Sequence, residues 1–162
     1  MVNFFMNRIP LICLSVVLAM FSQIDPTRAD AVGTPIVVSG DVLEVAGQRV
    51  QLYGVDAPEL DQTCVADRQR FNCGYIAKTA LMDLVAGTEV SCRIIIDKRT
   101  DAAMATCTAG GFDLGSNMVH TGWALADRRL SEKYVEVEDK ARKANRGLWR
   151  GQFIPPWKWR ER

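Results

Sequence analysis

The chain has 162 residues, with 20 lysines and arginines against 19 aspartates and glutamates. This length suits one ordinary globular domain plus whatever is removed from its N-terminus. The nearly balanced charge argues against a protein with broad electrostatic affinity for nucleic acid.

The N-terminal residues have the pattern of a signal peptide. Residues 1–8 carry one arginine and no acid, and residues 9–24 form an apolar run that is only lightly broken. We predict a signal peptide over residues 1–31, cleaved near residues 29–31. An uncleaved anchor is the alternative, although the run is short for a full span. No later segment has the apolar length to cross a membrane, so we expect an exported protein of the periplasm or the extracellular space.

Short strands and helices alternate along the rest of the chain. We predict strands at 35–39, 42–45 and 48–55, joined by tight turns at 40–41 and 46–47. A helix over 74–85, a hairpin over 90–96 and 102–108, and a helix over 114–121 follow. Ser131 is expected to cap a last helix, which ends at 145–147. Five strands with interspersed helices favour a mainly β or α+β fold, a small closed barrel of the oligonucleotide-binding type.

Four cysteines remain once the signal peptide is removed. An even number in an exported chain predicts two disulfides, for which the sequence alone allows three pairings. Cys92 and Cys107 flank the predicted hairpin and would lie opposite each other on adjacent antiparallel strands, which leaves Cys64 to pair with Cys73. Zinc is the competing explanation, but the chain has no Cys-x-x-Cys pair.

Three acidic residues on two neighbouring segments carry the main chemical signal. Asp41 follows Gly40, while Asp56 and Glu59 belong to the run Asp-Ala-Pro-Glu. Carboxylates suit Ca²⁺ or Mg²⁺, and a carboxylate placed one water beyond the ion can deprotonate that water for attack on phosphorus. The residue before a proline is extended, so the Ala57 carbonyl is free to face an ion. The alternative is that both segments are ordinary turns with surface acids.

Several further motifs occur in order with these acids. They are Gly40-Asp41, Leu52-Tyr53-Gly54-Val55-Asp56-Ala57-Pro58-Glu59, Cys73-Gly74, Asn117-Met118-Val119 with Gly122-Trp123-Ala124, and Tyr134-x3-Glu138-x2-Ala141-Arg142-x4-Gly147-Leu148-Trp149. From about residue 37 to residue 149, the chain resembles the staphylococcal nuclease, or thermonuclease, family. The resemblance implies a five-stranded oligonucleotide-binding barrel with three helices. We expect this nuclease-like domain over residues 32–150 and a basic, tryptophan-rich tail over 151–162.

The resemblance also implies an activity, the Ca²⁺-dependent hydrolysis of phosphodiesters in DNA and RNA. Carried over by position, Asp41, Asp56 and the main-chain oxygen of Ala57 would bind calcium, or another divalent cation. Glu59 would be the general base that acts on water.

The chain departs from the family pattern at the two arginines that contact the scissile phosphate. Gln51 and Ala102 stand at the positions where the family has arginine. Because an arginine in phosphoryl transfer can be worth roughly 10³–10⁵ in rate, we expect a nuclease whose activity is weak or lost. Arg49, two residues before Gln51 on the same strand face, and Arg99, in the hairpin turn, are possible substitutes.

The C-terminal stretch is basic and rich in tryptophan. From residue 142 to residue 162 there are seven basic residues and one acid, with Trp149, Trp157 and Trp159 among them. Such a stretch can bind single-stranded nucleic acid or anionic lipid. Alternatively, Trp149 and Phe153 hold the last helix against the barrel, and the final residues are a solubilising tail.

Two functions stay open on the sequence. The first is an exported, metal-dependent nuclease with impaired phosphate recognition. The second is a non-catalytic barrel that binds a nucleic acid, another ligand or an envelope protein partner. For either function we expect a monomer.

Overall fold

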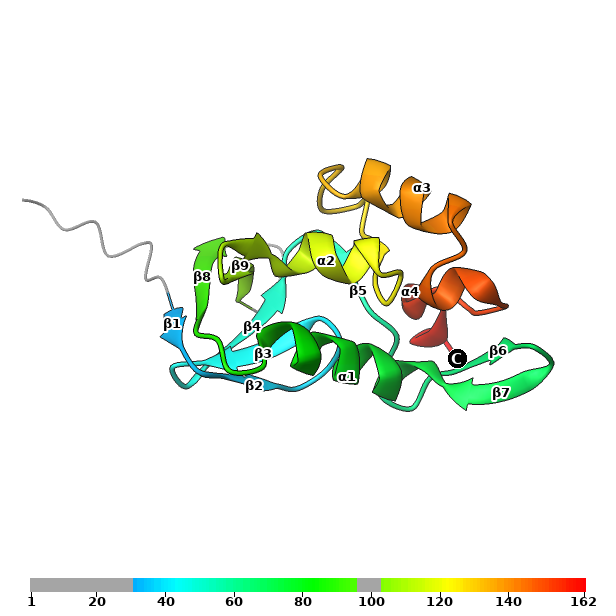
Figure 1. The fold of residues 1–162 in the computed structure, drawn as a ribbon, viewed down its shortest axis with the longest axis horizontal. Helices are drawn as coiled ribbons and strands as arrows, with labels where there is room; N and C mark the ends of the chain where they lie inside the picture. The colour runs from blue at the N-terminus through cyan, green and yellow to red at the C-terminus, as the bar shows by residue number, and fades with distance from the viewer. Residues whose placement is uncertain (1–30, 96–102) are drawn as a thin grey trace, which may run out of the picture.

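The computed structural model describes residues 31–95 and 103–162, coloured in Figure 1. The predicted signal peptide, up to residue 30, therefore lies outside the described residues, as do Arg99 and Ala102 of the predicted hairpin turn. Among the described residues, no helix combines the length and apolarity needed to span a membrane.

The largest sheet contains strands β1 (Ala31–Gly33), β2 (Pro35–Val37), β3 (Val42–Val45), β4 (Gln48–Leu52), β8 (Val90–Ile95), β9 (Met104–Ala109) and β10 (Phe112–Asp113). Its strand order is β1-β8-β9-β4-β3-β2, with β10 paired to β9. The pairing of β4 with β9 is parallel and the other pairings are antiparallel. The hydrogen-bonded path is open, but its two ends, β1 and β2, are separated in the chain by Thr34 alone.

The helices are α1 (Cys73–Val85), α2 (Leu114–His120), α3 (Val135–Lys143), the 3₁₀ turn η1 (Gly147–Arg150) and α4 (Pro156–Trp159). Of these, α1 contacts β2 and α2 contacts β9 of this sheet. Asn72 caps α1 and Asp113 caps α2, each accepting a hydrogen bond from the backbone N–H three residues on. Alternate strand residues such as Leu43, Val45, Val50 and Leu52 meet Ala77 and Leu81 of α1 in one core. This strand-rich α+β architecture confirms the predicted fold class, but the strands form an open sheet and not the closed barrel that was expected.

Two expected elements differ from those observed. The predicted strand over 48–55 stops at Leu52, because Gly54 has a φ of 79° that turns the chain. Residues Val55–Asp56 then form a separate strand, β5, which pairs with β11 (Leu125–Ala126). The helix expected after Ser131 is α3, and it begins only at Val135; the Ser131 hydroxyl instead accepts a hydrogen bond from the Lys133 N–H.

The hairpin of β6 (Thr63–Ala66) and β7 (Gln69–Asn72) was not expected from the sequence. Asp67 and Arg68 form its turn with φ values of 51° and 63°, which is the geometry of a two-residue turn of the kind that matches strand twist. The signal was weak, since neither residue is a glycine or an asparagine and most of the hairpin is partly exposed. Residue 152 pairs with Val65, so the C-terminal segment lies along this hairpin (Figure 1).

Both predicted disulfides are present. Cys92 and Cys107 face each other in register on β8 and β9, with Cα atoms 4.0 Å apart. Cys64 and Cys73 join β6 to the start of α1, with a Cα separation of 5.6 Å. Two structural disulfides are compatible with an exported protein.

Candidate functional site

Asp41 lies in a tight turn that only a glycine at position 40 allows. The N–H groups of Val38 and Ser39 both donate to the Val42 carbonyl, which folds the turn back on itself. A side chain on Gly40 would come within 2.8 Å of the Cβ atoms of Ala57 and Ala77. The turn can therefore pack against α1 and bring Asp41 close to the segment that follows Asp56.

Three donors hold the Asp41 carboxylate. The Ser39 hydroxyl donates to Oδ1 at 2.8 Å, and the Ala57 N–H donates to Oδ2 at 3.2 Å. The Gln51 amide is a weaker third donor to Oδ2 at 3.5 Å. Asp41 is buried, and this burial raises its pKa from the ordinary value of 3.8 to about 6.

Asp56 is placed by the short β5–β11 ladder, in which it is paired with Leu125. Its side chain is buried. Burial raises the pKa of Asp56, although hydrogen bonds and charge from Arg160 act in the opposite direction.

Glu59 is positioned through its backbone. Its N–H donates to the side-chain oxygen of Gln62, and its carbonyl accepts the Gln62 N–H at 2.8 Å. Gly74 packs so closely that a Cβ there would lie 1.7 Å from the Glu59 carbonyl oxygen. The N-terminal end of α1 thus contacts the backbone of the Glu59 loop and determines its position.

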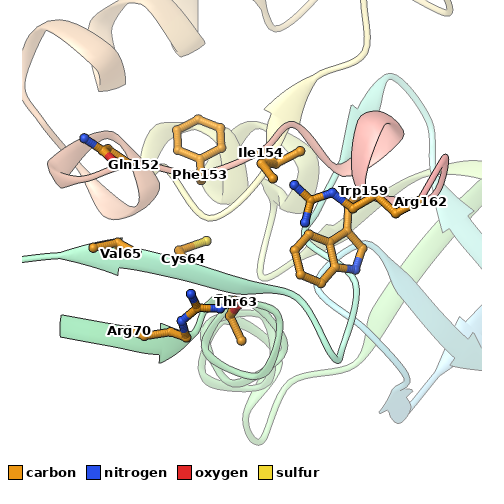
Figure 2. A pocket seen from close by; sticks show the side chains of 9 residues that line it. All are labelled: Thr63, Cys64, Val65, Arg70, Gln152, Phe153, Ile154, Trp159 and Arg162. Carbon is orange, nitrogen blue, oxygen red and sulfur yellow. Dashed lines mark hydrogen bonds between the residues drawn. The ribbon is translucent and has the colours of Figure 1, made fainter. Parts of the chain in front are cut away.

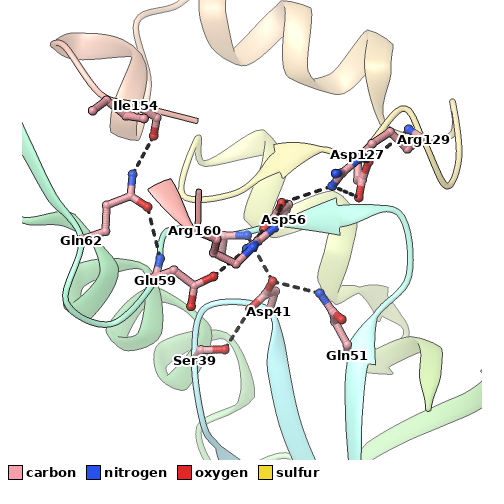
Figure 3. Close-up of polar contacts among 11 residues, drawn as sticks. Ser39, Asp41, Gln51, Asp56, Glu59, Gln62, Asp127, Arg129, Ile154 and Arg160 are labelled. Atoms are coloured by element: carbon pink, nitrogen blue, oxygen red, sulfur yellow. Dashed lines mark hydrogen bonds and ion pairs between the residues drawn. The ribbon is translucent and has the colours of Figure 1, made fainter. Parts of the chain in front are cut away.

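Several predicted site residues line one hollow of about 570 Å³. Asp41, Gln51 and Glu59 contribute to its wall, and so does Arg49, the possible substitute on β4. Asp56 lies behind this wall, because Arg160, which does line the hollow, covers it (Figure 3). Leu60, Asp61 and residues 38, 39 and 42 complete the lining.

Arg160 is the main site residue that sequence reasoning did not identify. Its guanidinium donates to both carboxylate oxygens of Asp56, at 3.0 and 2.7 Å, and to Glu59 at 2.6 Å. The only sequence signal was the basic character of the tail, which does not indicate which arginine folds back.

A second cation lies near Asp56 and was also missed. Arg129 pairs with Asp127 through two hydrogen bonds of 2.8 Å and approaches Asp56 at 3.7 Å. Burial acts to raise the pKa of Asp127, but the Arg129 hydrogen bonds hold it below its ordinary value. Trp157 of α4 lies beneath Arg129, with the ring centre 5.7 Å from the guanidinium carbon.

The donor chemistry suits a hard cation, whereas the present placement does not. Asp41, Asp56 and the Ala57 carbonyl offer only oxygen ligands, which Ca²⁺ and Mg²⁺ prefer. In residues 31–95 and 103–162, however, no three side chains of His, Cys, Asp or Glu are gathered around one point where an ion would fit. Because Arg160 already occupies both oxygens of Asp56, an ion would fit these residues only after Arg160 moves away.

Comparisons with known proteins place the chain in a family. The family model described as staphylococcal nuclease homologue matches residues 49–151. A succinoglycan biosynthesis protein, ExoI, of Rhizobium meliloti (strain 1021) is 34% identical over 126 residues, which cover 75% of this chain and 65% of that protein. A probable staphylococcal-like nuclease, CAN2, of Oryza sativa subsp. japonica is 27% identical over 125 residues, or 75% of this chain and 32% of that protein. The match thus spans less than two thirds of either relative.

Proposed function

Because the chain belongs to the staphylococcal nuclease homologue family, we propose that it is an exported, divalent-cation-dependent phosphodiesterase of low turnover that acts on nucleic acid. The observation that carries this proposal is the meeting of Asp41, Glu59 and Gln51 on one hollow, with Asp56 directly behind Arg160. Two disulfides support export to the periplasm or the extracellular space.

Each residue has a separate part in the proposed reaction. Asp41, Asp56 and the Ala57 carbonyl would hold the cation, for which Ca²⁺ is the family's choice. When bound, the ion would polarise the phosphate and favour ionisation of a water. Glu59 would take the proton from that water, and its loop is rigid enough for this because Gln62 and Gly74 fix its backbone.

Low turnover is expected because the hollow has Gln51 where the family has an arginine that contacts the phosphate. Negative charge develops on the phosphate oxygens in the transition state, and preorganised cations stabilise it. Gln51 offers a neutral amide that is directed at Asp41. Losing one preorganised donor costs roughly 10²–10³ in rate, so a site without the Gln51-position arginine turns over slowly. Arg49 lines the same hollow and is the remaining β4 cation that can reach a phosphate there.

The proposal is tested with the purified chain, lacking residues 1–30, single-stranded DNA and Ca²⁺. We expect slow, calcium-dependent cleavage that the Glu59→Gln variant reduces at least tenfold. The variant Gln51→Arg should increase the rate by roughly 10²-fold, since it restores a charged donor. Cleavage that is undiminished by Glu59→Gln, or that does not need a divalent cation, would exclude this site as its source.

A second candidate is a non-catalytic nuclease-like protein. The ion pairs of Arg160 with Asp56 and Glu59 favour it, because they occupy the same side chains that metal binding and proton transfer require. In that case the hollow binds a nucleic acid, another ligand or an envelope partner without turnover. This candidate would be selected if the wild type, Glu59→Gln and Gln51→Arg all bind single-stranded DNA and none of them cleaves it.

A further inference from the structure

The C-terminal segment after η1 is anchored to the domain along its length. Val65 and Gln152 exchange two backbone hydrogen bonds of 2.9 and 2.7 Å, and a Cβ on Gly151 would collide with the Val65 carbonyl oxygen at 2.0 Å. Figure 2 shows the segment passing beside β6, with Gln152 at one end of a hollow of about 390 Å³ and Trp159 and Arg162 at the other. The register of the segment on the hairpin is therefore determined at its start.

Two further contacts lead the segment toward the acidic site. The fully buried Gln62 donates to the Ile154 carbonyl at 2.7 Å while its oxygen holds the Glu59 N–H. At the far end, the Trp159 indole N–H donates to Asp61 at 3.3 Å. The loop that carries Glu59 and the C-terminal segment are thus connected by one contact just before α4 and one at its last residue.

Arg160 follows Trp159 in the chain, and its guanidinium binds the acids in the way that a metal cation would. Its two terminal nitrogens bind the two oxygens of Asp56 and one oxygen of Glu59 (Figure 3). Asp56 keeps only 2% of its side chain exposed, whereas 43% of the Arg160 side chain faces solvent. A buried carboxylate is costly without a positive partner, and Arg160 supplies that partner from the outside.

We propose that Arg160 is an intramolecular counter-cation that competes with a divalent metal ion for Asp56 and, at the same time, holds the Glu59 carboxylate. This inference rests on the metal site of the proposed function. A divalent ion bound to Asp56 would carry the same sign of charge as the guanidinium within a few ångströms of it, so the two repel and exclude each other. Binding of the ion therefore moves Arg160 away from Asp56 and frees the Glu59 oxygen.

Only the last residues of the chain need to move when the ion replaces Arg160. Residues 160–162 are exposed and follow the last residue of α4, so they can leave without opening the core. Arg129 does not replace Arg160, because its two short bonds go to Asp127 and it stays 3.7 Å from Asp56. The resting protein is thus closed to the metal by one side chain.

The competition is measured by calorimetric titration of Ca²⁺ into the chain lacking residues 1–30, with no nucleic acid present. Arg160→Gln should bind Ca²⁺ at least tenfold more tightly than the wild type. Arg162→Gln is the matched control. It removes the same charge two residues further along the chain, and the Arg162 side chain stacks on Trp159 and does not contact the acids. Its affinity should stay within about twofold of the wild type. Arg160→Lys keeps the charge without the two-pronged contact and should lie between wild type and Arg160→Gln.

A second readout follows the segment itself. Calcium should change the fluorescence of Trp157 and Trp159 in the wild type as Arg160 leaves, and this change should be smaller in Arg160→Gln, where the contact is already broken. Equal calcium affinity in all four proteins, or weaker binding by Arg160→Gln, overturns the inference and leaves the metal site of the proposed function intact. The absence of calcium binding in every variant overturns the inference together with that metal site.

Discussion

At the scale of single residues, Asp41 is a carboxylate held in a place that disfavours its charge. It is buried, it has only neutral hydrogen-bond donors, and the charges of Asp56 and Glu59 add to the effect of burial on its pKa. Such a group destabilises the ion-free fold and becomes favourable when a cation arrives. Functional sites commonly store this kind of cost.

The first prediction concerns Asp41→Asn and pH. The pKa is about 6 in the folded protein against 3.8 for the ordinary group, so the folded state holds the proton more tightly. The contribution of protonated Asp41 to the free energy of unfolding is full below about pH 4 and is lost as the pH rises through 6. Since a tenfold change in proton affinity corresponds to ~1.4 kcal/mol, Asp41→Asn should raise the unfolding free energy at pH 8 by at most roughly 3 kcal/mol without metal.

Urea unfolding at pH 8 and pH 3.5 in a chelator checks this expectation. The gain should become small at pH 3.5, where Asp41 is protonated in the folded state and mostly protonated in the unfolded state. The exposed Glu132→Gln change serves as the control for charge removal and should show little effect at either pH. A destabilising Asp41→Asn change at pH 8 would contradict the assignment of burial as the dominant cause.

At the scale of elements, close backbone contacts through glycines place the site residues. Gly40 lets the Asp41 turn touch Ala57 and Ala77, and Gly74 lets the start of α1 touch the Glu59 carbonyl. Gly54 ends β4, so that Asp56 lies on the separate β5–β11 ladder. The packing of helices and turns thus helps to set the candidate metal and base positions.

The second prediction tests the contact of α1 with the Glu59 loop. A Cβ at residue 74 would lie 1.7 Å from the Glu59 carbonyl oxygen, so Gly74→Ala must shift the loop or the helix. Overpacking of this kind costs about 1–3 kcal/mol, and we expect that loss in urea unfolding. The shift also moves Glu59, so cleavage of single-stranded DNA should fall more than the loss of folded protein explains.

Lys78→Ala on the same helix provides the comparison for Gly74→Ala. It changes an α1 side chain that does not carry the Glu59 contact, and it should leave the unfolding free energy within about 0.5 kcal/mol. Equal stability of Gly74→Ala and Lys78→Ala would mean that the loop accommodates the added methyl group without cost.

At the scale of the whole molecule, four parts of the chain supply charges to one place. Asp41 comes from the turn before β3, Asp56 and Glu59 from the segment after β4, Asp127 and Arg129 from the stretch after β11, and Arg160 from the C-terminal end. Four acids and two arginines lie there, and both arginines contact acids. An added divalent ion should therefore bind by displacing a guanidinium group from the acids.

The third prediction concerns calcium and the melting temperature. An ion that binds only the folded protein stabilises it, so the Tm should rise with calcium concentration. Asp56→Ala removes a proposed ligand and should abolish this rise, whereas Asp83→Ala on the exposed side of α1 should preserve it. A Tm that calcium leaves unchanged, in the wild type and in Arg160→Gln alike, contradicts the proposed metal site.

Much of this protein follows from local rules in its sequence. Burial alternates along β3 and β4, apolar spacing marks α1, and a hairpin places Cys92 opposite Cys107, because each depends on residues of one element or of one hairpin. The acids Asp41, Asp56 and Glu59 were identified from local sequence in the same way, since Gly40 permits a tight turn beside Asp41 and Pro58 favours an extended residue before it. The end of β4 at Leu52 and the late start of α3 were missed, because Gly54 packs against Ser131 and Tyr134, which are distant in the sequence and directly precede α3.

The sequence by itself determined the fold class, the disulfide partners and the identity of the acidic residues. Only the tertiary structure decided what neutralises them. Arg160 contacts Asp56 across 104 positions of the chain, and it does so because the β6–β7 hairpin, Gln62 and α4 direct the C-terminal segment back to the site. No local pattern distinguishes Arg160 from Arg162, since the difference lies in where the folded chain carries each side chain.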